Sequence, residues 1–205
     1  MKSIFLFISL LFGLMLPFSA LAQTTTDIPF DTINWVFPGN YKITEFEGKE
    51  ALLIMQNGTV FKYGAKAYLK DYKFSDGIIE FDFYSPHDDF TFLGFFFRFT
   101  THNDEDRYEL FFFQPTRTSY LPVNNGIIHL SCYDDGIYKR AGNIEPQVWH
   151  HIRAEIDGPH VVVYMDDEEN ITINNLGRGL SKGSIGLWAG ETTSRCYFAN
   201  FKVTQ

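Results

Sequence analysis

The sequence has few cysteines and fewer basic than acidic residues. Its 205 residues include two cysteines, 17 lysines and arginines, and 25 aspartates and glutamates, so the formal net charge is -8 at pH 7. A face that binds phosphates needs clustered Lys and Arg, and the composition therefore argues against nucleic acids and anionic membrane surfaces as partners. A phosphate-binding loop, a dinucleotide fingerprint and a serine-hydrolase elbow are also absent from the sequence.

Long hydrophobic runs are lacking everywhere except at the N-terminus. Lys2 is followed by an apolar run of about 13 residues, Ile4 to Leu16, and then by the small-residue box Ala20-Leu21-Ala22. A membrane anchor needs about 20 apolar residues, whereas this pattern is typical of a secretory signal peptide cleaved after Ala22. We therefore expect residues 1–22 to be removed, no membrane insertion after cleavage, and a secreted or periplasmic location.

Export bears on the two cysteines. In an oxidising compartment Cys132 and Cys196 could form a disulfide. Two buried free thiols fit the sequence as well, and both alternatives stay open at this point.

Phenylalanine is the residue in excess, with 22 in the chain, of which four lie in residues 1–22 and 18 remain for the folded domain. After a polar leader, residues 23–27, the chain is a succession of short runs rich in β-branched and aromatic residues, punctuated by Gly, Asn and Asp. Glu47-Gly48 and Asp157-Gly158 are among the turn signals between these runs. The predicted strands are 41–46, 50–55, 59–69, 78–85, 90–100, 107–114, 127–133, 148–157, 160–165, 171–174, 183–189 and 196–204.

These runs alternate with period two and show no helical period. Ile79, Phe81 and Phe83 alternate with Glu80, Asp82 and Tyr84, which places opposite chemistry on opposite faces of one strand. A dozen such strands predict an all-β fold, a two-sheet antiparallel β-sandwich or jelly roll, with most of the phenylalanines between the sheets. No linker or repeat interrupts residues 28–205, which we interpret as a single domain.

Several segments together resemble the concanavalin A-like lectin/glucanase superfamily, in particular secreted laminin-G-like and 3-keto-disaccharide-hydrolase-like modules. The resemblance implies a jelly roll whose curved sheet can hold a sugar chain on its concave face, in a fold that hosts lectins, glycosidases and adhesion modules alike. The matching segments are 48–54, 74–83, 94–99, Tyr108-Glu109, 120–126, Trp149-His150, 164–166, 183–188 and 197–203.

The segment Glu80-Phe81-Asp82-Phe83-Tyr84-Ser85 resembles the catalytic strand of laminarinase-type glucanases, Glu-x-Asp-x-(x)-Glu. A retaining mechanism needs two carboxyl groups on one side of the strand, about 5–5.5 Å apart. Tyr84 or Ser85 stands where the second Glu is needed, so the motif argues against a glucanase of this type. Glu80 and Asp82 are then expected to be polar residues on the outer face of a strand.

Arg98 and Glu109 interrupt two consecutive aromatic strands, and hairpin pairing could bring them face to face. Gly94, on the same face as Arg98, would leave open space above the sheet. Arg98 could then fork onto sugar hydroxyls with Glu109 orienting it. The alternative is a structural cross-strand ion pair.

Further ligand-binding candidates lie on the strands and loops around this pair. Tyr84 and Trp188 could stack on a sugar, while Trp35 and Trp149 are expected to pack against the sheets. Only one of His150 and His151 can point inward, because strand residues alternate faces. The remaining candidates are Tyr108 and Gln114, on the face opposite Glu109, together with Tyr120 and Asn125, which bracket a predicted loop at the rim.

No cofactor is predicted. The acidic loop containing Asp88 and Asp89 could supply oxygen ligands for Ca²⁺, although short acidic loops are usually just solvated. Taken together, the sequence favours a secreted carbohydrate-binding module with its ligand on the concave sheet face. The first alternative is a glycoside-cleaving enzyme of the 3-keto-disaccharide-hydrolase-like type that uses Glu80, Asp82 or Glu109, and the second is an adhesion module without a small ligand.

Overall fold

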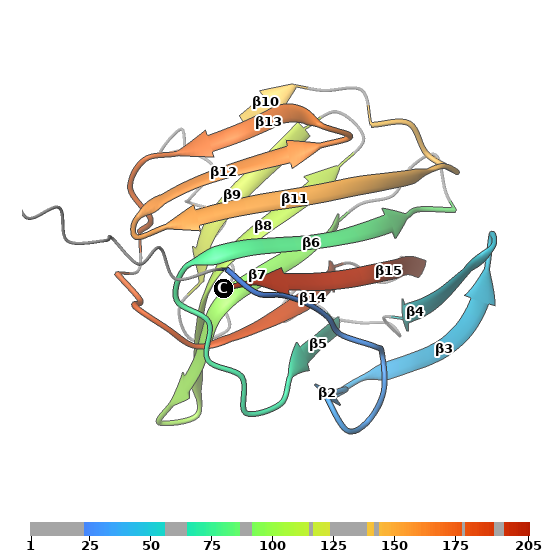
Figure 1. Cartoon of the computed structure of the whole chain (residues 1–205), viewed down its shortest axis with the longest axis horizontal. Coiled ribbons are helices and arrows are strands. Elements are labelled where there is room, and N and C mark those ends of the chain that lie inside the picture. Colours follow the sequence, from blue (N-terminus) through green and yellow to red (C-terminus); the bar gives the residue numbers. More distant parts are fainter. Residues whose placement is uncertain are drawn as a thin grey trace, which may run out of the picture.

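The computed structural model describes residues 23–55, 65–86, 92–114, 117–123, 139–141, 144–177, 179–190 and 195–205. In these residues the chain forms strands and turns only, arranged as two antiparallel sheets that face each other (Figure 1). Among them no helix is long and apolar enough to cross a membrane. The prediction of an all-β antiparallel sandwich is confirmed.

The larger sheet has eight strands in the order β13-β12-β11-β6-β15-β4-β3, with β1 pairing alongside β15. Its strands are β1 (Thr25–Asp27), β3 (Asn40–Phe46), β4 (Lys49–Met55), β6 (Gly77–Tyr84), β11 (Trp149–Asp157), β12 (His160–Met165), β13 (Glu168–Ile173) and β15 (Arg195–Thr204). Because β1 pairs with the end of β15, this sheet begins within the polar leader.

The smaller sheet has seven strands in the order β10-β9-β8-β7-β14-β5-β2. They are β2 (Trp35–Val36), β5 (Ala65–Leu69), β7 (Phe92–His102), β8 (Glu105–Gln114), β9 (Arg117–Val123), β10 (Lys139–Ala141) and β14 (Ser184–Gly190). The expected rim loop around Tyr120 is wrong, because residues 117–123 pair with β8 as a full strand. The predicted strand 127–133 lies outside the described residues.

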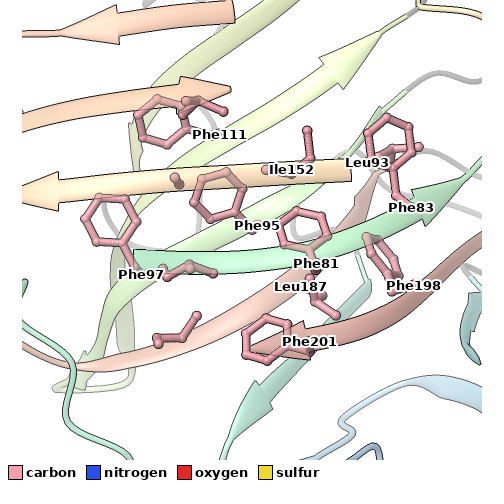
Figure 2. Packing of buried hydrophobic residues seen from close by; sticks show 14 of the residues in the cluster. Phe81, Phe83, Leu93, Phe95, Phe97, Phe111, Ile152, Leu187, Phe198 and Phe201 are labelled. Carbon is pink, nitrogen blue, oxygen red and sulfur yellow. The ribbon is translucent and has the colours of Figure 1, made fainter. Parts of the chain in front are cut away.

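Phenylalanine rings fill the space between the sheets, as the sequence predicts (Figure 2). Phe83 of β6 stacks on Phe113 of β8 with ring centroids 5.4 Å apart, and Phe95 of β7 stacks on Phe111 at the same distance. Rings of this size bury a large apolar area each, which is the main favourable term in folding. The excess of phenylalanine is thus the core of the sandwich.

Tight turns connect neighbouring strands where the sequence indicates them. Glu47 and Gly48, with φ of 44° and 77°, join β3 to β4, and Asn103 and Asp104, with φ of 52° and 61°, join β7 to β8. Two residues with positive φ form the turn whose twist matches that of antiparallel strands. The register of both hairpins follows from these turns.

Cys196 is a free thiol buried in the core. The disulfide alternative is therefore not realised in the structure, and Cys132 lies outside the described residues. Burial raises the pKa of the Cys196 thiol to about 12.

Candidate functional site

The outer face of the eight-stranded sheet, the face turned away from the smaller sheet, carries a row of polar and aromatic side chains. In β6, Ile79, Phe81 and Phe83 point into the core, which leaves Glu80, Asp82 and Tyr84 on the outer face. The predicted alternation in this strand is confirmed.

Strand β11 lies next to β6 and repeats the pattern. Trp149 is in register with Tyr84, His151 with Asp82, and Arg153 with Glu80. His150, between them, points into the core and packs against Phe83. One histidine therefore faces inward and the other outward, as strand alternation requires.

Four partly exposed aromatic rings gather at one end of the outer face, and we call them the aromatic cluster: Phe46, Tyr84, Trp149 and Tyr197. Phe46 stacks on Tyr197 with centroids 3.7 Å apart and meets Tyr84 edge-on at 4.9 Å. Tyr84 and Trp149 lie 5.5 Å apart. The indole Nε1 of Trp149 has no hydrogen-bond partner among the described residues.

The aromatic cluster shows that the sheet curves around its outer face. Phe46 on β3 and Trp149 on β11 are separated by three intervening strands, which in a flat sheet is about 19 Å at the usual strand spacing. Their ring centroids are only 6.3 Å apart. The β3–β4 hairpin therefore bends over the outer face, and its strong curvature is visible in Figure 1. The outer face is concave at this end.

Asp82 is the centre of a hydrogen-bonded network beside the aromatic cluster. Its Oδ2 accepts hydrogen bonds from Lys49 Nζ at 2.7 Å and Asn200 Nδ2 at 2.6 Å, and its Oδ1 lies 2.7 Å from His151 Nδ1. Burial raises the pKa of this carboxyl, but the hydrogen bonds from Lys49, His151 and Asn200 and the charge of Lys49 outweigh it, so the pKa of Asp82 lies below its usual range. Asp82 is thus an ionised anchor.

Two local backbone features aim the donors at Asp82. Asn200 sits in a bulge of β15 with φ of 53°, a conformation that Asn tolerates better than most residues. Lys49 follows the Glu47-Gly48 turn, and its Nζ also lies 4.6 Å from the centroid of the Trp149 ring. Lys49 therefore joins the polar network to the aromatic cluster.

His151 is more accessible than Asp82 and Lys49, with 40% of its side chain exposed. An ionised carboxylate only accepts hydrogen bonds, so the proton between His151 Nδ1 and Asp82 resides on the imidazole. Its Nε2 lies on the outer face, 3.6 Å from Glu80 Oε1. An imidazole oriented in this way by a carboxylate can accept or deliver a proton at Nε2.

The expected pairing of Arg98 with Glu109 is wrong. Arg98 sits in a bulge of β7 with φ of 53°, and Phe97 is in register with Glu109 instead. The guanidinium of Arg98 donates to the carbonyl oxygens of Ser75 and Gly158 and to Asp76. Arg98 thereby ties β7 to two turns of the larger sheet.

The open space expected above Gly94 is also absent. A Cβ at this position would overlap the backbone of Phe111 and Phe112 in the neighbouring strand. Glycine is required here because the two strands approach each other closely.

Glu109 is fully buried between the sheets. Its Oε2 accepts a 2.5 Å hydrogen bond from the hydroxyl of Tyr120, which in turn accepts one from the backbone N–H of Gly177. The structure therefore places both predicted ligand-binding residues in a buried network that links β8 and β9 to the segment after β13.

Two other aromatic candidates lie on the smaller sheet. Tyr108 and Trp188 are buried on its outer side in a cluster with Phe96, Leu110 and Phe112. Burial raises the pKa of the Tyr108 hydroxyl far above its usual range. Neither residue is near the aromatic cluster of the larger sheet. Gln114, at the end of β8, is also on this sheet.

Asn125, Asp88 and Asp89 lie outside the described residues. Within the described ranges, no group of three or more His, Cys, Asp or Glu side chains is arranged to hold a metal ion. The acidic side chain of Asp106 forms an ion pair with Lys66 and accepts a hydrogen bond from Thr101.

The site thus brings together three of the predicted residues, Glu80, Asp82 and Tyr84, and adds others that sequence reasoning missed. Phe46, Lys49, Tyr197 and Asn200 come from strands distant in the sequence. Trp149 and His151 could have been found from the alternation of polar and apolar residues in β11. In this strand Trp149, His151, Arg153 and Glu155 are partly exposed, and the residues between them are buried. The sequence does not say which strand is the neighbour of β11.

Comparison with known proteins supports the fold and adds a family. Residues 31–204 match the family model of the 3-keto-alpha-glucoside-1,2-lyase-like domain. No curated protein sequence matches the chain significantly.

Three solved structures share the architecture. The carbohydrate-binding module CBM66 from Bacillus subtilis is 18% identical, with a TM-score of 0.65 over 83% of this chain and 95% of its own. A prokaryotic beta-1,3-1,4-glucanase (lichenase) from a mouse hindgut metagenome is 13% identical, with a TM-score of 0.61 over 89% and 98%. The beta-glucanase of Bacillus licheniformis is 11% identical, with a TM-score of 0.56 over 86% and 94%. The expected concanavalin A-like jelly roll is confirmed.

Proposed function

The chain belongs to the family of 3-keto-alpha-glucoside-1,2-lyase-like domains, and from this premise we propose that it binds a saccharide on the outer face of its eight-stranded sheet. The observation that carries the proposal is the position of the aromatic cluster directly beside the polar network of Asp82. Sugars present C–H faces to aromatic rings and hydroxyl groups to polar side chains, and a binding site needs both within one concave surface.

The residues of the site have distinct roles in this proposal. Trp149 and Tyr84, both partly exposed, supply ring surface. His151 and Glu80 offer polar atoms on the outer face, with side-chain exposures of 40% and 24%. Lys49 and Asn200 hold Asp82 in place. Structural relatives with carbohydrate-binding and glucanase names support this proposal.

Binding is tested with the protein lacking residues 1–22 on a glycan array, followed by calorimetry on the glycans that bind. Trp149→Ala is expected to lower affinity about 10-fold or more, since truncating a central aromatic anchor typically costs at least 1.4 kcal/mol. Tyr68→Ala, which removes a partly buried ring on the other sheet, is the matched control and should leave affinity unchanged. Equal losses in both variants, or no loss in Trp149→Ala, would contradict the proposal.

A second function is favoured by one observation, the orientation of His151 by the ionised Asp82. In a 3-keto-α-glucoside the carbonyl at C3 acidifies the proton at C2. We propose that His151 Nε2 removes this proton, so that the C1–C2 double bond forms as the bond from C1 to the glycosidic oxygen breaks. The imidazolium that forms on His151 then gives this proton to the departing oxygen, and the Glu80 carboxylate, 3.6 Å from Nε2, stabilises the imidazolium while it exists.

This elimination has a specific test. With 3-keto-trehalose as substrate, the wild type should release glucose together with an unsaturated keto sugar, and unoxidised trehalose should stay intact. His151→Gln is expected to lose at least 100-fold in rate while it retains saccharide binding. If His151→Gln released glucose as fast as the wild type, His151 would not be the base in the elimination.

We also propose that the chain is exported, which rests on the signal-peptide pattern of residues 1–22. N-terminal sequencing of the protein recovered from the periplasm or medium of an expressing cell should begin at Gln23. Recovery of the full chain in the cytoplasm would contradict export.

A further inference from the structure

A second feature of the outer face is a pocket of about 560 Å³ at the end opposite the aromatic cluster. It is lined by Asp76, Ile78, Glu155, Asp157, His160 and Val162, among others. Ile78 and Val162 provide its apolar surface, and three carboxylates surround them. Neither the family match nor the polar network around Asp82 accounts for this pocket.

Strand register shows that the pocket and the aromatic cluster share one surface. Along β6 and β11 the outward pairs follow one another: Tyr84 with Trp149, Asp82 with His151, Glu80 with Arg153, and Ile78 with Glu155. Tyr84 and Ile78 are six residues apart on the same strand, which corresponds to about 20 Å. This span is longer than a disaccharide.

The side chains between the two ends are accessible. The side-chain exposures of Glu80, His151 and Arg153 are 24%, 40% and 35%. A ligand that starts on the aromatic cluster can therefore extend along the strands, over His151 and Arg153, into the pocket.

The charges of the pocket limit the class of ligand. Asp76 is paired with Arg98 and also accepts the backbone N–H of Gly158, and Glu155 is paired with Arg153. Asp157 has no ion-pair partner among the described residues. Carboxylate oxygens accept hydrogen bonds from hydroxyl groups, whereas the uncompensated charge of Asp157 would repel a uronate carboxylate.

We propose that the pocket is the distal part of the saccharide site, so that the preferred ligand is an uncharged oligosaccharide longer than a disaccharide. This inference rests on the proposed saccharide binding and deepens it. The aromatic cluster anchors one end of the chain, and the pocket accepts the hydroxyl groups of the other end.

The experiment is calorimetry with glucose oligosaccharides of two, three, four and six units, in α-1,4-, β-1,4- and β-1,3-linked series. In the wild type, affinity for the recognised linkage should rise at least 10-fold from the disaccharide to the tetrasaccharide. Val162→Lys, which places a long side chain in the pocket, should abolish this rise and leave disaccharide affinity unchanged. Trp149→Ala should weaken every length. Thermal melts of both variants establish that they are folded.

The outcomes separate this inference from the function on which it rests. If affinity did not depend on the length of the oligosaccharide but Trp149→Ala still lowered it, the inference would be overturned and saccharide binding would stand. A tetragalacturonate that binds as tightly as the neutral tetrasaccharide would overturn the assigned ligand class. Failure of all three series to bind at any length would contradict the proposed function and with it the inference.

Discussion

Replacing Asp82 by asparagine removes the charge on which the polar network converges. Three donors reach the carboxylate, from Lys49, Asn200 and His151, at 2.6 to 2.7 Å. An amide of the same size offers only one acceptor oxygen. At least one donor would then face the amide nitrogen, and Lys49 would lose its counter-charge.

The loss of stability in Asp82→Asn can be estimated from these contacts. A hydrogen bond that involves a charged group contributes about 1.5–3 kcal/mol, and the Lys49 contribution is reduced by solvent because 29% of that side chain is exposed. We expect Asp82→Asn to lower the free energy of unfolding by about 2–3 kcal/mol at pH 7. For a domain of this size, that corresponds to a fall in Tm of roughly 4–12 °C.

The effect should depend on pH with a definite sign. The pKa of Asp82 is lower in the folded protein than in the unfolded chain, where it is near 3.9. The ionised carboxylate therefore stabilises the fold fully above that value, and the stabilisation is lost as pH falls below about 4 through the folded pKa. The difference between wild type and Asp82→Asn should narrow from pH 7 to pH 3.

Urea denaturation of both proteins at pH 7, 5 and 3 measures this difference. Asp27→Asn is the control, since the Asp27 side chain is 82% exposed and 3.7 Å from Lys202, and its stability should be close to that of wild type at each pH. A loss below about 1 kcal/mol at pH 7, or one that is equal at pH 7 and pH 3, would refute the role assigned to Asp82.

Three further predictions concern the buried structure. Arg98→Met should lower the free energy of unfolding by about 2–4 kcal/mol in urea denaturation, because it leaves two carbonyl oxygens without their donor. If the folded variant instead bound saccharide more weakly than the wild type, Arg98 would have a role in binding. Gly94→Ala should cost about 3 kcal/mol or more, since its Cβ overlaps the adjacent backbone, and near wild-type stability would contradict that close approach. In a Cys132→Ser background, the Cys196 thiol, with its pKa raised to about 12, should react with a disulfide reagent at pH 8 only after unfolding; rapid labelling of the native protein would show that it is accessible.

Much of the fold follows from local patterns. Strand alternation identifies the core phenylalanines, and the Glu47-Gly48 and Asp157-Gly158 signals mark hairpins that the structure contains. Residues 117–123 are not predicted as a strand, because Pro122 and the polar Thr118 and Ser119 weaken the strand pattern. The pairing of this segment with β8 decides its structure, and that pairing is a tertiary effect.

The site is less predictable than the fold. Alternation correctly places Glu80, Asp82 and Tyr84 on one face, but their partners come from β3, β4, β11 and β15, whose order in the sheet is not encoded locally. For Arg98, in contrast, alternation predicts the wrong orientation of the side chain. A bulge with φ of 53° turns its side chain toward Ser75 and Gly158, and strict alternation cannot anticipate a bulge.

The most direct test of saccharide binding on the outer face uses the three tryptophans of the chain. Trp35 donates its indole N–H to the carbonyl of Pro29, and Trp188 is buried on the other sheet. The indole signals in ¹⁵N-edited NMR spectra, assigned by single Trp→Phe variants, are followed during titration with the glucose oligosaccharide series. The Trp149 signal should shift in a saturable manner while the Trp35 signal stays in place. Saturable binding that leaves the Trp149 signal unmoved would contradict the site.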